Sequence, residues 1–170
     1  MMNGLFLTPL LFGLASAAQP AQDAPEWGEP RAGVFYAARV PAGWKNPFPE
    51  DATHSVAYAD FGGQSGRIDF SVSPMAYEPT KSDWMGMFRA ERIRLYANPA
   101  PIKVGRLHGY QAMGVETMLP GVNPGGQRGF LRAKLVRPGA MYHISCDCPA
   151  ADLKKWLGSF QAVIKSFRPR

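Results

Sequence analysis

The chain has 170 residues, of which 46% are hydrophobic and 19% are charged, and this balance excludes a disordered or fibrous protein. Lys and Arg outnumber Asp and Glu by 19 to 13, for a formal net charge of +6. Residues 1–85 carry 5 basic and 9 acidic side chains, whereas residues 86–170 carry 14 basic and 4 acidic ones. This asymmetry predicts a dipolar surface that attracts an anionic partner or membrane face. In the alternative interpretation, the cations only solvate outward faces.

The first eighteen residues have the pattern of an export signal. Residues 1–18 carry no charged side chain, residues 5–14 are almost all apolar, and Ala15-Ser16-Ala17 supplies the small residues that signal peptidase accepts. The apolar run is shorter than the ~20 residues of a membrane span. We therefore expect cleavage after Ala17 or Ala18 and a periplasmic or secreted product with no transmembrane anchor. Export also argues against nucleic acid as the partner.

The remaining chain, about 150 residues, is a common size for one domain. Residues 19–32 are rich in Pro, Ala and acidic residues and are interpreted as a flexible tether. Residues 33–170 form the predicted globular domain. Alternating apolar and polar residues, bounded by Pro and Gly turns, predict strands over 33–40, 54–61, 67–74, 102–107, 110–118, 127–136 and 141–146.

Two segments have helical spacing instead. Capping side chains at residues 79–83 predict a helix over 84–96. A second helix is expected to begin at Pro149, capped by Asp147 or Cys148. Its apolar stripe comprises Leu153, Trp156, Leu157, Phe160, Val163, Ile164 and Phe167. The fold class is therefore α+β, with an antiparallel sheet of six or seven strands, one mid-chain helix and one C-terminal helix.

Several motifs resemble the PsbP-like superfamily, which includes exported DcrB-like bacterial proteins. They are the Pro41-x-Gly43-Trp44-Lys45 turn, the strand of residues 142–146 and the helix end of residues 164–168. The resemblance covers about residues 33–168 and implies an α/β/α sandwich around a central antiparallel sheet. It also implies a binding or accessory protein rather than an enzyme. From the residues themselves, we expect Trp44 to pack over a sheet edge and Phe167 to close the last helix against the core.

The sequence contains no recognisable catalytic, cofactor-binding or metal-binding motif, so we expect no cofactor and no enzyme activity. His54, His108 and His143 have no metal-ligand spacing. His143 lies on the strand face opposite Tyr142 and Ile144, and we expect each histidine to be solvent-exposed or hydrogen-bonded within the protein. A nucleophilic pair of Cys148 and His143 would define a thiol enzyme, the least favoured alternative.

The two cysteines, Cys146 and Cys148, are separated by one residue. In an oxidising compartment they form a disulfide, or Cys146 is a buried apolar residue and Cys148 a free thiol. An extended strand holds alternate Cα atoms near the ~7 Å limit for a bridge. Both interpretations stay open at this point.

Basic side chains supply the one candidate interaction surface. Arg128, Arg132 and Lys134 alternate along one predicted strand, and Arg89 and Arg92 lie on the first predicted helix. They predict a patch for an acidic protein or another anionic surface. The leading hypothesis is an exported, non-catalytic binding or accessory protein. The alternative from another class is an immunity or inhibitor protein that uses the loop of residues 119–126.

Overall fold

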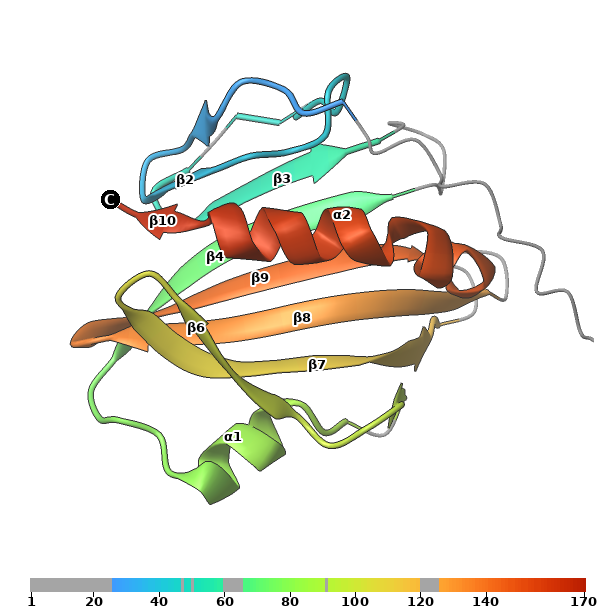
Figure 1. The fold of residues 1–170 in the computed structure, drawn as a ribbon. Coiled ribbons are helices and arrows are strands. Elements are labelled where there is room, and N and C mark those ends of the chain that lie inside the picture. Colours follow the sequence, from blue (N-terminus) through green and yellow to red (C-terminus); the bar gives the residue numbers. More distant parts are fainter. Residues whose placement is uncertain (1–25, 47, 50, 60–65, 91, 120–125) are drawn as a thin grey trace, which may run out of the picture.

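The computed structural model describes residues 26–170 except residues 47, 50, 60–65, 91 and 120–125 (Figure 1). The predicted signal peptide, the first part of the predicted tether and most of the candidate inhibitor loop of residues 119–126 lie outside the described residues. Residues 26–32 belong to the fold, contrary to the expected tether. The amide of Gly28 donates to the carbonyl of Val40 at 3.1 Å, and Ala42 donates to Glu26 at 2.7 Å. These backbone hydrogen bonds fix a segment whose proline content had suggested freedom.

A seven-stranded antiparallel sheet forms the centre of the molecule. Its strand order is β3-β4-β9-β8-β7-β5, and β6 pairs with β7 along the same edge as β5. The bounds are β3 His54–Tyr58, β4 Arg67–Met75, β5 Ile93–Leu95, β6 Ala100–Val104, β7 Leu107–Thr117, β8 Gln127–Arg137 and β9 Gly139–Pro149. The predicted α+β class with an antiparallel sheet of six or seven strands is confirmed.

The membership of the sheet differs from the prediction at one strand. The predicted strand 33–40 contributes β2, Tyr36–Ala38, to a separate three-stranded sheet with β1, Arg31–Ala32, and β10, Arg168–Pro169. Its place in the main sheet is taken by β5, residues that were predicted to be helical. Strand β2 leaves the main sheet because it pairs with β10, which comes from the far end of the chain. Local sequence patterns do not indicate such a distant partner.

The first helix, α1, spans Lys81–Met87, so the prediction of residues 84–96 is wrong at both ends. It begins early because Thr80 and Asp83 form a capping box, each side chain bonded to the other residue's backbone amide. It ends early because the chain turns to pair Ile93 with Glu116 and Leu95 with Gly114. That edge of β7 satisfies backbone groups that a longer helix would have satisfied internally.

The second helix, α2, spans Leu153–Ser166 after a 3₁₀ turn, η1, over Ala150–Asp152. Pro149 closes β9 instead of opening the helix, and Asp152 is the N-cap residue, so both predicted caps are wrong. The predicted apolar stripe is confirmed. Trp156 and Leu157 are partly buried against the core, and the other five members are buried: Leu153, Phe160, Val163, Ile164 and Phe167.

Aromatic rings join α2 to the sheet. Phe167 has no exposed surface, and its ring centre lies 6.1 Å from Tyr36, 6.1 Å from Phe70 and 5.4 Å from Tyr142. The Trp44 ring lies edge-on to Trp156 at 5.4 Å. A side chain at Gly66, just before β4, would approach Trp44 to 2.8 Å. These contacts give Phe167 and Trp44 the structural roles expected for them.

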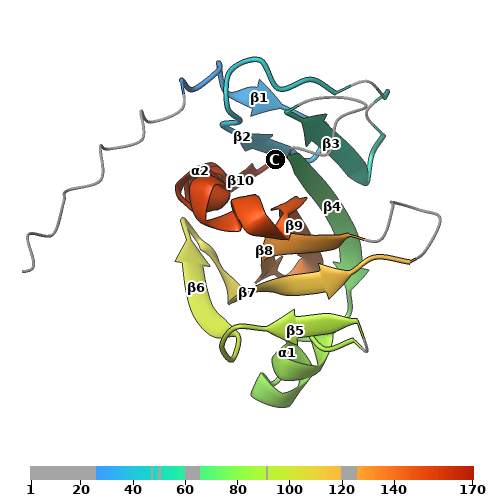
Figure 2. The same ribbon diagram turned by 90° about the vertical axis from the view of Figure 1, so that its right-hand side faces the viewer.

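The two faces of the main sheet are covered differently. On one face, α2 packs against β8 and β9, while α1 lies on the opposite side of these strands (Figure 2). Trp84 of α1 forms a smaller core with Val136 and Met141. The three layers therefore form an α/β/α sandwich. Among the described residues, neither helix has the length and hydrophobicity needed to cross a membrane.

Candidate functional site

The face of the sheet nearer α1 carries a polar network centred on Arg132. Its Nη2 donates to Glu116 at 2.5 Å and to Asp147 at 3.2 Å, and its Nε donates to Ser145 Oγ at 3.0 Å. Antiparallel register brings these residues together from β7, β8 and β9, because Arg132 pairs directly with Ser145. The two carboxylates therefore neutralise the Arg132 charge within the protein.

The three histidines lie apart, each with its own partner. His54 Nε2 lies 3.0 Å from Asp69, which also pairs with Arg67. His108 Nε2 lies 2.9 Å from Glu78. His143 is half-buried rather than exposed, and its Nε2 lies 3.2 Å from Ser73 Oγ, which fits the hydrogen-bonded alternative. Burial, and secondarily the Lys134 charge, lowers the pKa of His143 to about 4. Among the described residues, no three His, Cys, Asp or Glu side chains gather closely enough to hold a metal ion.

The predicted basic patch is divided between two elements. Arg128, Arg132 and Lys134 are half-buried on β8, whereas Arg89 and Arg92 are exposed after α1. A cavity of about 190 Å³ lies beside β8, and Arg89, Arg92 and Arg128 are not among its lining residues. Arg132 and Lys134 line it from the sheet, and Phe88 and Ile93, which flank the two exposed arginines in the chain, line it from the other side.

The thiols lie on the other face of the sheet. Cys146 and Cys148 are free and buried, and both belong to the core beneath α2. His143 points to the opposite face, because it is an odd number of residues from Cys148 along β9. The hypothetical Cys148–His143 nucleophilic pair is therefore not formed. Burial raises the pKa of Cys148 to about 12 and that of Cys146 well above its usual value.

We therefore expect both thiols to resist alkylation in the folded protein at pH 8 and to react fully in denaturant. The thiolate is the reactive form, and burial suppresses it at both positions. Iodoacetamide labelling followed by intact-mass measurement tests this. Rapid labelling of Cys148 in the folded state would contradict it, and an unlabelled mass lower by two hydrogens would show a disulfide.

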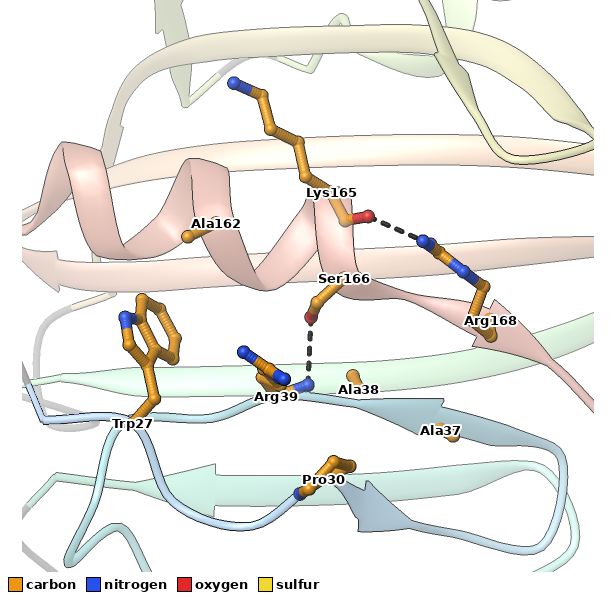
Figure 3. A pocket seen from close by; sticks show the side chains of 9 residues that line it. All are labelled: Trp27, Pro30, Ala37, Ala38, Arg39, Ala162, Lys165, Ser166 and Arg168. Carbon is orange, nitrogen blue, oxygen red and sulfur yellow. Dashed lines mark hydrogen bonds between the residues drawn. The ribbon is translucent and has the colours of Figure 1, made fainter.

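A second concave surface, hereafter the α2 groove, lies at the C-terminal end of α2 (Figure 3). It has a volume of about 580 Å³ and is bounded by the segment before β1, by β2 and by α2. Its lining residues are Trp27, Pro30, Ala37, Ala38, Arg39, Ala162, Lys165, Ser166 and Arg168. Because the alanine side chains are small, they leave space in the groove between Trp27 and the basic residues Arg39 and Arg168.

Local hydrogen bonds hold the groove together. The Arg39 amide donates to Ser166 Oγ at 2.9 Å, which ties β2 to the helix end. Arg168 Nη1 donates to the carbonyls of Lys165 and Phe167 at 2.9 and 2.6 Å, where the helix dipole is negative. Figure 3 shows the Arg39 side chain extending toward Trp27, with Lys165 directed away from both. The guanidinium of Arg39 is therefore the cation that faces the apolar wall.

Sequence reasoning did not find the α2 groove. Trp27 and Pro30 fell in the segment interpreted as a tether, and Arg39 fell in a predicted strand. The groove exists because β2 lies between β1 and β10, and β10 follows α2 directly. A Trp within a proline-rich segment was the only local signal, and that ring is partly buried against the core.

The layers and strand order define the class of fold, a PsbP-like α/β/α sandwich. Two solved structures share it over most of their length. CyanoP, the cyanobacterial PsbP of Synechocystis, superposes with a TM-score of 0.60 at 12% identity, covering 92% of this chain and 99% of that chain. LpqN of Mycobacterium tuberculosis, involved in cell envelope biogenesis, gives 0.59 at 11% identity, covering 79% and 82%.

A third similar structure comes from Bacteroides thetaiotaomicron. It has a TM-score of 0.53 at 13% identity, and the match covers 82% of this chain but 47% of that longer chain. No family model matches the sequence, and no curated protein matches it either. The resemblance inferred from sequence motifs is thus confirmed at the level of the fold.

Proposed function

We propose that this chain is an exported accessory protein that acts by binding another protein in the periplasm. The α2 groove is its docking surface, and the occupant is an extended segment that carries an acidic side chain between apolar ones. The uncharged apolar leader at residues 1–18 supports export. The likeness in fold to LpqN, a protein involved in cell envelope biogenesis, and to CyanoP is compatible with an accessory role.

The observation that carries this proposal is the chemistry of the groove. Arg39 has no carboxylate within ion-pair distance among the described residues, and no acidic side chain lines the groove. Trp27 and the small alanines provide a surface for apolar side chains beside that cation. Arg and Trp are the residues that most often dominate protein interfaces. A carboxylate on Arg39 would form a charge-assisted hydrogen bond as the apolar flanks are buried.

A defined peptide tests the proposal. We expect a fluorescent peptide that alternates leucine and glutamate to bind, and Arg39→Glu or Trp27→Ala to weaken binding by about tenfold or more, because each removes an interface anchor. The leucine–glutamine version of the peptide should bind more weakly. Fluorescence anisotropy measures all of these affinities.

Arg106→Glu is the matched control, because Arg106 is exposed in the turn between β6 and β7, outside the groove. This variant should bind as the wild type does. Equal binding by Arg39→Glu and wild type, or equal loss in Arg106→Glu, would show that the α2 groove is not the docking surface.

A further inference from the structure

The cavity under α1, here the Lys134 cavity, combines one charged wall with one apolar wall. It lies between the C-terminal end of α1 and the polar face of the sheet. Met87, Phe88 and Ile93 form one side, and Phe130, Arg132, Lys134, His143 and Ser145 form the other. Its volume of about 190 Å³ equals roughly six water molecules at about 30 Å³ each, enough for a small organic molecule.

The polar groups of the cavity are satisfied within the protein, with one exception. Arg132 is paired with Glu116 and Asp147. Ser145 Oγ accepts from Arg132 and donates to Asp147 at 2.9 Å. The low pKa of His143 keeps its ring neutral near pH 7.

Lys134 is the exception. No carboxylate of the described residues lies within ion-pair distance of its ammonium group, which lies 5.8 Å from the centre of the Phe88 ring. Burial, and secondarily the charge of Arg132, lowers the pKa of Lys134. A half-buried cation without a counter-charge is unfavourable, and an anion bound beside it would remove that penalty.

The apolar wall limits the kind of anion. On this side Phe88 is buried and Met87 and Ile93 are partly buried, and the buried ring of Phe130 adds apolar surface from the sheet. These side chains offer no hydrogen bonds to the extra oxygens of a phosphate or sulfate, and they favour a hydrocarbon group. The exposed Arg89 and Arg92 lie in the segment between Phe88 and Ile93 and attract anions to this side of the molecule.

We propose that the Lys134 cavity binds a small carboxylate with a short hydrocarbon chain, the carboxylate paired with Lys134 and the chain packed against Phe88 and Ile93. This site is separate from the α2 groove, since the two share no lining residue. Either site can therefore fail in experiment without affecting the other.

A titration of hexanoate into the full chain tests the proposal. Isothermal calorimetry measures the affinity, and NMR chemical shifts report which residues are affected. We expect one hexanoate per chain, with binding weakened by about tenfold or more in Lys134→Met, because a charged hydrogen bond is lost. Methionine matches the apolar stem of lysine and lacks only its charged end, so the wall of the cavity is preserved. Lys134→Arg keeps the charge and should retain binding. Lys103→Met, at an exposed position on β6, should bind hexanoate as the wild type does.

The same titration with hexanol, hexylammonium and inorganic phosphate separates the two walls. If all three bind weakly, the cavity requires both the negative charge and the hydrocarbon chain of its ligand. Absence of hexanoate binding would overturn the proposal, as would unchanged binding in Lys134→Met. Hexanol binding as tightly as hexanoate would show an apolar cavity only, and phosphate binding as tightly would show an unselective anion site. Circular dichroism of each variant confirms that it is folded.

Discussion

Replacement of Phe167 by alanine should lower the free energy of unfolding by about 3–5 kcal/mol, the range found when a buried phenylalanine is truncated. The ring is fully buried where three elements meet: it contacts Tyr36 of β2, Phe70 of β4 and Tyr142 of β9. Its loss leaves a cavity that none of these rings can fill without moving the others. Urea denaturation followed by circular dichroism measures the change.

Tyr77→Ala is the matched control, because Tyr77 is an aromatic residue with 60% of its surface exposed. Surface substitutions usually change stability by about 0.5 kcal/mol or less. A loss below about 1 kcal/mol in Phe167→Ala would mean that α2 is not held to the sheet through this ring.

Replacement of Arg132 by methionine should lower the free energy of unfolding by about 2–3 kcal/mol. The side chain of Arg132 is 24% exposed and that of Asp147 is 12% exposed, so removal of the cation leaves two carboxylates in a partly dry environment. Breaking a fully buried pair costs about 3–5 kcal/mol, and partial exposure reduces that value. Arg106→Met, at an exposed site, serves as the control.

A double-mutant cycle isolates the ion pair itself. We expect the Arg132→Met and Glu116→Gln changes to be non-additive by about 1 kcal/mol, because residues in one hydrogen-bonded network share their energy. Strict additivity would show that Glu116 is not coupled to Arg132, which then stabilises the sheet through Asp147, Ser145 and the Phe130 ring, 4.2 Å from its guanidinium carbon.

The elements with strong local periodicity were predictable from sequence. Ile68, Phe70 and the polar residues between them gave β4, and the stripe from Leu153 to Phe167 gave α2 together with its buried face. Both patterns repeat over several turns or pleats, so packing against a core reinforces the local preference. The residues on either side of Thr80 also indicated the start of a helix, although three residues too late.

The elements that depend on distant partners were not predictable. Ile93 and Leu95 fit a helix stripe as well as an edge strand, and only the free edge of β7 decides between them. The same holds for the candidate sites. Nothing near Arg39 in the sequence indicates Ser166, and nothing near Lys134 indicates Phe88, because the contacts join elements far apart in the chain. Sequence alone did identify Arg132 and Lys134 as a pair, but not the carboxylates that neutralise only one of them.

The strand order also has a consequence for how the chain is made. Strand β4 finds its inner neighbour only in β9, whose paired residues follow 64 positions later at Met75 and Gly139 and 80 positions later at Arg67 and Asp147. Strand β2 likewise pairs with β10, which lies at the C-terminal end of the chain. Such long-range pairing slows folding. During synthesis, β2 and β4 therefore complete their pairing only after the last third of the chain has been made.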